Sequence, residues 1–128
     1  MRLLLDTHLL LWAAEDSPRL SETARNLISD TRNERWFSAA SFWEIAIKNG
    51  RGRDDFDVDS AQLRIEMLAS SYFELPISSM HAILTATLQH FHKDPFDRIL
   101  IAQATAEGLT LLTADPIVAK YPGPIRRV

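Results

Sequence analysis

The chain has 128 residues, of which 46% are hydrophobic and 24% charged, a composition typical of an ordinary globular protein, so we expect residues 1–128 to form a single domain. It contains no cysteine, which excludes disulfides, thiolate nucleophiles and Cys-ligated metal sites and fits a reducing compartment. The net charge of −3 argues against a protein that holds nucleic acid mainly on a large basic face. A cluster of acidic residues that binds divalent cations would, however, be locally positive.

The first half of the chain alternates between strand and helix patterns. Residues 3–5 are a short apolar strand, and the Leu-rich stretch 8–14 favours a helix. A second helix is predicted to start at Ser21, a typical N-cap, and to continue through Ile28. Residues 35–39 are predicted to form a strand. Ser41 and Glu44 then have the spacing of a capping box at the start of a helix that ends at Asn49-Gly50.

The middle of the chain begins with a polar loop, residues 51–59. Apolar residues at helical spacing predict a helix over 61–69. A strand is expected over 72–77, ending near Pro76, and is followed by a helix over 79–89.

The last third contains the best-marked helix. Asp94 is a plausible N-cap before Pro95, and the helix is predicted to stop at Gly108. The apolar run 109–112 is typical of a buried strand. Asp115-Pro116 is expected to open a short helical turn, and residues 124–128 to form an edge strand.

Strands that alternate with helices predict an α/β fold with a mainly parallel sheet covered on both faces. Ligands of such sheets bind beyond the carboxyl ends of the strands. Asp6 and Asp115 directly follow the two most apolar strands, and Glu44 and Asp97 are expected in the first turns of helices. All four acids are therefore predicted to lie at the same rim.

Clustered carboxylates repel one another unless cations lie between them. Mg²⁺ and Mn²⁺ prefer oxygen ligands and leave positions open for phosphate oxygens, an arrangement suited to phosphodiester hydrolysis. The histidines offer a poorer metal site, because His81, His90 and His92 lack the His-Glu-x-x-His pattern and are expected at the surface or at helix ends.

Each acid also has a structural explanation. Asp94 is better explained as a helix N-cap than as a ligand, and Glu44 could complete the capping box. Asp97 could stabilise the helix dipole, and Asp115 could cap the last short helix. Asp6 could be a turn residue, but a carboxylate that ends a buried strand is costly to desolvate without a partner.

Other residue types have open interpretations. Arg98 could contact RNA phosphate, as could a basic patch of Lys48, Arg51 and Arg53, or these side chains could be solvated. The aromatic residues Trp12, Trp36, Phe42 and Trp43 are expected in the core rather than on a base-stacking surface. The apolar run from Leu3 is too short to span a membrane, and we expect a cytoplasmic protein.

Three blocks carry a family resemblance: LLLDTHLLLWA at 3–13, SAASFWEIAIK at 38–48 and HKDPFDRILIAQATAEGLTLLTAD at 92–115, with Tyr121 trailing. Through these blocks nearly the whole chain resembles the PIN-domain family and, within it, the VapC-type ribonuclease toxins of bacterial toxin–antitoxin pairs. The resemblance implies a PIN-like three-layer fold and Mg²⁺- or Mn²⁺-dependent cleavage of RNA. It also implies a homodimer and a small cognate antitoxin that inhibits the enzyme.

The resemblance further implies roles for individual residues. The catalytic and metal-binding acids would be Asp6, Glu44, Asp97 and Asp115. Asp6 and Asp97 would be direct ligands, while Glu44 and Asp115 would help to bind a metal or orient its water. Thr113 would hydrogen-bond a carboxylate. Asp94 matches the Asp-Pro-Phe-Asp form of the motif, and its role stays open.

Two other functions compete with this prediction. A receiver-like phospho-acceptor signalling domain has a similar length and an acidic pocket, but it needs paired acids after the first strand and a late lysine, which Asp6-Thr7 and Asp115 do not provide. A PIN-like binding module without activity is the second alternative, and the full set of four acids argues against it.

Overall fold

The computed structural model describes residues 1–51 and 56–128; part of the predicted loop 51–59 therefore lies outside the described residues. Five strands form one parallel sheet in the order β3-β2-β1-β4-β5. The strands are β1 Arg2–Leu5, β2 Glu34–Ser38, β3 Phe73–Leu75, β4 Thr110–Thr113 and β5 Ile125–Arg127. The two most apolar strands, β1 and β4, are adjacent. The parallel pairing of all five strands confirms the predicted α/β architecture.

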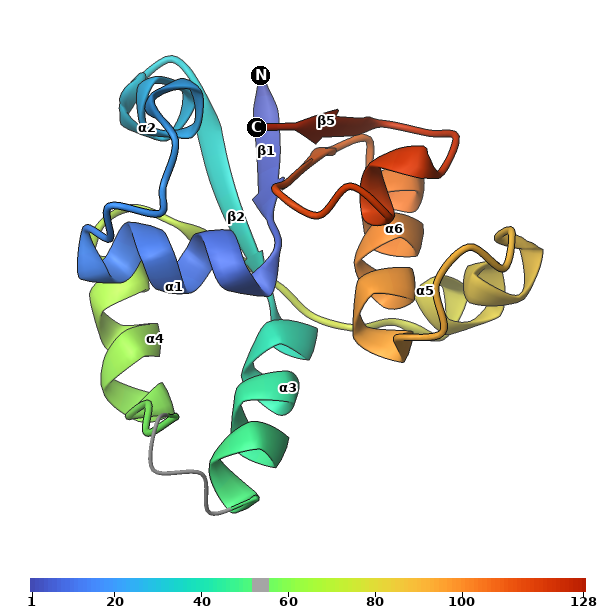
Figure 1. Ribbon diagram of the computed structural model, residues 1–128, viewed down its shortest axis with the longest axis horizontal. Coiled ribbons are helices and arrows are strands. Elements are labelled where there is room, and N and C mark those ends of the chain that lie inside the picture. The colour runs from blue at the N-terminus through green and yellow to red at the C-terminus, as the bar shows by residue number, and fades with distance from the viewer. Residues whose placement is uncertain (52–55) are drawn as a thin grey trace.

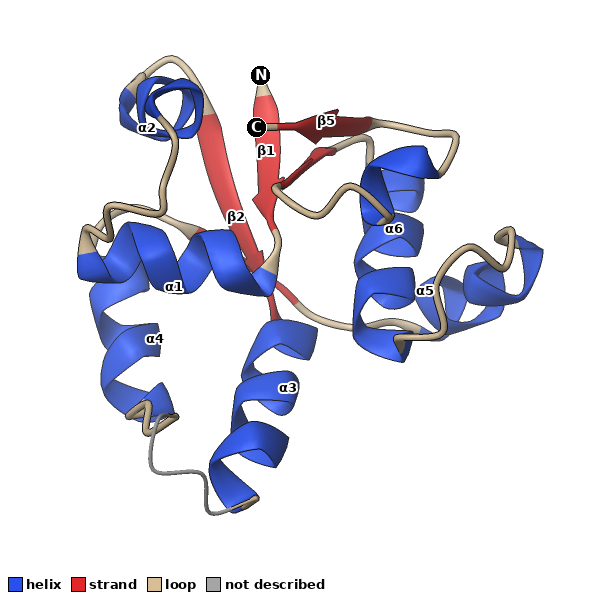
Figure 2. Ribbon diagram, in the orientation of Figure 1, coloured by secondary structure: helices blue, strands red, loops and turns tan. Residues whose placement is uncertain are grey.

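Six α-helices flank this sheet, as Figures 1 and 2 show. They are α1 Thr7–Glu15, α2 Glu22–Ser29, α3 Ala39–Gly50, α4 Ser60–Ala69, α5 Ser79–Leu84 and α6 Pro95–Glu107, with two short 3₁₀ turns, η1 Thr85–Thr87 and η2 Val118–Lys120. In Figure 1, α1, α2 and α4 lie on one side of the sheet and α5 and α6 on the other. Among the described residues, none of the helices is long and apolar enough to cross a membrane.

The adjacent strands β1 and β4 bury both of their faces, which explains their apolar runs. Leu3 and Leu5 belong to the core beneath α1, α2 and α4, whereas Leu4 between them packs into the second core beside α6. On β4, Leu112 and Leu111 divide between the two cores in the same way. Side chains of a strand alternate between its faces, so every apolar residue in these runs has a packing partner.

Several helix boundaries agree with the sequence prediction. Ser21 caps α2, with its side chain accepting a hydrogen bond from Ala24 N at 3.1 Å. Asp94 caps α6 by accepting from Phe96 N at 2.8 Å. Gly108 ends α6 in the left-handed conformation (φ 67°), which turns the chain toward β4. These local signals set the start and end of the helix that carries Asp97.

The predicted capping box of Ser41 and Glu44 is wrong. The helix starts three residues earlier, at Ala39, and Ser38 caps it by accepting from Ala40 N at 3.0 Å. Ser41 lies inside α3, where its hydroxyl accepts a hydrogen bond from Thr7 Oγ1 at 2.9 Å. Two serines three residues apart offered alternative caps, and the end of β2 at Ser38 selects the first.

The predicted helix over 79–89 is also too long. It ends at Leu84, and a 3₁₀ turn follows. The hydroxyls of Thr85 and Thr87 donate to the carbonyls of Ala82 and Leu84, at 2.6 and 2.8 Å. Such bonds from a side chain to the preceding turn compete with a continuing helix. The strand expected over 72–77 is likewise shorter, ending at Leu75 just before Pro76.

Candidate active site

Two acids of the site cap the turns that leave neighbouring strands. Asp6 follows β1 and is the N-cap of α1, with Oδ1 accepting from Leu9 N at 2.8 Å. Asp115 lies just beyond β4, and its Oδ1 accepts from Ile117 N at 2.8 Å. Because β1 and β4 are adjacent parallel strands, both carboxylates lie at the same rim of the sheet. Asp6, considered from the sequence as a turn residue, is thus a helix cap, whereas the predicted cap of the last short helix by Asp115 is wrong, because the N-cap of η2 is Ile117. Both hydrogen bonds hold the carboxyl groups in place.

Asp97 is the electrostatic centre of the site. The pKa of its carboxyl is raised from 3.8 to about 7. Burial is the largest cause, and the negative charges of nearby acids contribute the rest; these acids are Asp94, Asp6, Glu44 and Asp115. This mutual repulsion shows that the structure brings the four predicted acids, together with Asp94, into one cluster. Ionised carboxylates held this way are destabilised until a positive charge enters.

Asp6 is the most deeply buried acid of the cluster. Its residue is 5% exposed, and burial is the main reason that the pKa of its carboxyl is raised. Hydrogen bonds from the Thr113 hydroxyl and the Leu9 amide oppose that rise. The Thr113 oxygen also accepts from Asp115 N at 3.0 Å, so this buried threonine connects the acids that follow β1 and β4.

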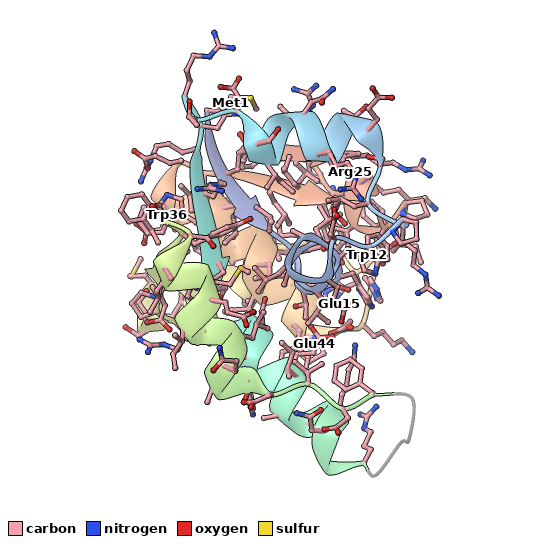
Figure 3. All side chains as sticks on the ribbon, turned by 90° about the vertical axis from the view of Figure 1, so that its left-hand side faces the viewer. Met1, Trp12, Glu15, Arg25, Trp36 and Glu44 are labelled. Atoms are coloured by element: carbon pink, nitrogen blue, oxygen red, sulfur yellow. The ribbon has the colours of Figure 1, made fainter. Side chains whose placement is uncertain are left out.

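Glu44 enters the site from α3. It lies in the second turn of that helix rather than in the predicted first turn, because the helix begins at Ala39. Its carboxylate is buried and 2.9 Å from the ammonium of Lys48, one helical turn further on. Figure 3 shows Glu44 in the upper part of α3, just below α1. Lys48 therefore supplies a positive charge inside the acidic site, an ion pair that the sequence reasoning missed.

His92 is a second residue that the sequence reasoning missed. Its Nε2 lies 3.1 Å from Asp97 Oδ2 and 3.7 Å from Asp115 Oδ2. Its Nδ1 accepts from Asp94 N at 3.3 Å, which leaves Nε2 to carry the proton that faces Asp97. His92, Asp94 and Asp97 each offer a ligand atom within 4.8 Å of the others, a grouping able to hold a metal ion.

Arg98 is placed differently from the prediction of an RNA contact. Its guanidinium donates to the carbonyls of Gln89 and Thr85, at 2.7 and 2.8 Å, and to the Tyr121 hydroxyl at 3.2 Å. The same Tyr121 hydroxyl accepts from His92 N at 2.8 Å. Arg98 and Tyr121 therefore fix the segment that presents His92, and the donors of Arg98 are directed into the protein.

The aromatic residues do not all follow the core prediction. Trp12, Trp36 and Phe42 are partly buried, but Trp43 is 60% exposed and packs edge-on against Phe96, with ring centroids 5.1 Å apart. In the predicted basic patch, Lys48 is the partner of Glu44 and Arg51 is exposed, while Arg53 lies outside the described residues.

The donor set at the rim fits a hard divalent cation. Its groups are mainly carboxylate oxygens, the ligands preferred by Mg²⁺ and Mn²⁺. Asp6 is buried and Asp97 is partly buried, and a carboxylate removed from water is costly to ionise without a positive partner. Lys48 compensates only one charge of the cluster.

A family model described as the PIN domain matches residues 3–124 of the chain. No curated protein sequence matches the chain. Among solved structures, the chain is similar to VapBC2 from Rickettsia felis, in a complex with a DNA fragment from the VapBC2 promoter. The identity is 15% over 99% of this chain and 98% of that chain, with a TM-score of 0.70. A toxin-antitoxin complex from Klebsiella pneumoniae matches at 20% identity over 98% and 99% of the two chains, with a TM-score of 0.66. DNA-bound VapBC from Salmonella typhimurium matches at 15% identity over 99% and 98%, with a TM-score of 0.67. At these identities the structural likeness establishes the fold.

Proposed function

The chain belongs to the PIN domain family, whose members are generally nucleases, and on that premise we propose that it is an endoribonuclease that hydrolyses RNA phosphodiester bonds with Mg²⁺ or Mn²⁺. The observation that carries this proposal is the convergence of Asp6, Glu44, Asp97 and Asp115 from four separate segments at one rim of the sheet. Burial and the charges of the neighbouring acids raise the pKa of Asp97 there to about 7. A fold gains nothing in stability from such repulsion, so the cluster is best explained by a cation and a phosphate substrate.

Asp6 and Asp97 would hold the cation, and Glu44 and Asp115 would help to bind it or orient water. A cation bound there would lower the pKa of the attacking water and neutralise charge on the leaving oxygen. Thr113 orients Asp6 through its hydroxyl, and His92 orients Asp97 through Nε2. Asp94 caps α6 through one carboxyl oxygen, and we assign it this mainly structural role.

We further infer that the protein is the toxin of a VapBC-type pair, acting in the cytoplasm as a homodimer that a small cognate antitoxin inhibits. Support comes from the similar solved structures, which are VapBC proteins and a toxin-antitoxin complex.

The direct test is cleavage of a labelled RNA by purified protein freed of any partner. Cleavage should require Mg²⁺ or Mn²⁺ and stop when EDTA is added. Asp97→Asn should abolish it, whereas Asp94→Asn should keep most of the activity, because Asn is also a competent N-cap. Cleavage that is equal with and without chelator would refute the metal dependence. Binding of RNA without cleavage would instead favour the inactive PIN-like module.

A further inference from the structure

A cavity of about 450 Å³ opens directly beside the acid cluster. Glu44 and Asp94 form the wall that it shares with the cluster, and three basic residues, Lys48, Arg51 and Lys93, also line it. Lys48 is already paired with Glu44, at 2.9 Å. Arg51, at the C-terminal end of α3, and Lys93, just before α6, are both exposed and bring positive charge to the cavity from two separate segments.

The rest of the cavity wall is apolar and includes an aromatic ring. Ile47 and Phe96 line it together with Pro95. The Phe96 ring is held by an edge-on contact with Trp43, at an interplanar angle of 79° and a centroid distance of 5.1 Å. An aromatic ring fixed at a partly open surface offers a flat face on which a nucleic-acid base can stack.

From this arrangement we propose that the cavity is a subsite for one unpaired nucleotide of a single-stranded RNA, next to the bond that is cut. Arg51 and Lys93 bind its phosphate and the Phe96 ring stacks on its base. The inference rests on the proposed ribonuclease function and adds to it the residues that bind the substrate beside the acid cluster.

Charge and geometry favour this occupant. The chain carries a net charge of −3, so an RNA strand that approaches the acid cluster needs local positive charge. Arg51 and Lys93 provide it on the same cavity that contains Glu44. A base in an A-form duplex is stacked on its neighbours and cannot lie on a protein ring, whereas unpaired bases can. The subsite therefore selects single strands, loops and ends.

The test measures equilibrium binding of a fluorescein-labelled, unstructured RNA nonamer by anisotropy, with EDTA present so that metal-dependent cleavage does not interfere. Arg51→Gln/Lys93→Gln should weaken binding and lower the slope of log K against log salt by about 0.7, because each phosphate that the protein neutralises on a single strand contributes about 0.7 to that slope and both residues bind the same phosphate. Phe96→Leu keeps an apolar side chain but removes the ring, and should weaken binding by about tenfold or more.

The matched control is Arg32→Gln/Arg64→Gln, which also removes two positive charges. Both arginines form surface ion pairs elsewhere, with Asp30 and Glu74, so their replacement should cost little stability. The control should bind the nonamer like the wild type. Thermal melting and sedimentation of each variant would identify unfolding or a changed oligomeric state.

Weaker binding by the cavity variants alone, and weaker binding of a blunt RNA duplex than of the nonamer, would support the subsite. Equal affinities of the cavity and control variants would overturn it, even if the wild-type protein cuts RNA with Mg²⁺. A cavity variant that changes only the oligomeric state would overturn it as well, in favour of a contact between protein chains. Failure of the proposed function is a different result, namely no cleavage under any metal condition.

Discussion

Replacing Asp97 by Asn should stabilise the metal-free protein at pH 8. The Asp97 side chain is 21% exposed, and burial and neighbouring acids raise the pKa of its carboxyl to about 7 from an ordinary value of 3.8. At about 1.36 kcal/mol for each pH unit, this difference corresponds to about 4 kcal/mol of destabilisation when the group is ionised in the folded protein. Asn keeps the shape but weakens the hydrogen bond with His92, which offsets about 1–3 kcal/mol. A net gain of about 1–3 kcal/mol remains.

The pH dependence follows from the direction of the shift. Below pH 3.8, Asp97 is protonated in both the folded and the unfolded state. Between pH 3.8 and about 7 the unfolded chain loses this proton while the folded protein keeps it, so stability falls as the pH rises and then levels off. The Asn variant lacks this contribution, and its advantage over the wild type should grow between pH 5 and pH 8.

Urea denaturation in EDTA at pH 5 and pH 8 measures this effect. Asp30→Asn is the matched control, because Asp30 lies at the surface away from the acid cluster and hydrogen bonds from Arg32 lower its pKa to about 2, below the pH range of the measurement. It should give no gain at pH 8. The reasoning would be refuted if Asp97→Asn were less stable than the wild type at pH 8, or if its advantage did not depend on pH.

Three further predictions concern the metal and the scaffold. Mg²⁺ should raise the melting temperature of the wild type, because a hundredfold excess over its dissociation constant stabilises the folded protein by about 2.7 kcal/mol. Asp6→Asn/Asp97→Asn should reduce this rise. An equal rise in NaCl of matched ionic strength would exclude a specific site. Arg98→Ala should cost about 2–4 kcal/mol in denaturant titrations because it leaves the carbonyls of the 85–89 segment without their donor, and an unchanged midpoint would contradict this anchoring role. Gly108→Ala should cost about 1 kcal/mol through backbone strain at φ 67°, since the nearest atom to an added Cβ is 3.8 Å away; a loss of several kcal/mol would indicate a steric clash instead.

The parts of the fold and site that the sequence predicted depend on local signals. Asp6 follows a strand whose apolar run is unbroken, and Asp94-Pro95 marks the start of the helix that carries Asp97. Parallel strand order then places these acids at one rim, because all helices that follow such strands begin there. The Glu44–Lys48 pair also has a local signal, the spacing of four residues on a helix, and it could have been found from the sequence.

The missed features depend on interactions between distant segments. His92 faces Asp97 because Arg98 and the hydroxyl of Tyr121 fix the preceding loop, and no local pattern predicts that arrangement. The start of α3 could not be chosen from sequence, since Ser38 and Ser41 are both good caps. Adjacent residues of α3 also face different ways: Phe42 packs against the core, whereas Trp43 is exposed.

A divalent cation bound among the acids at the carboxyl ends of β1 and β4 is the central claim. The most direct measurement is the line broadening of backbone amide signals in ¹⁵N-labelled protein when substoichiometric Mn²⁺ is added. We expect strong broadening at Thr7, Asp97 and Asp115, with loss of that broadening in Asp6→Asn/Asp97→Asn. The chain offers a competing acidic surface, a cavity of about 250 Å³ lined by Glu15, Asp57, Asp59 and Glu66. Broadening centred on that cavity, with the rim of the sheet unaffected, would contradict the claim.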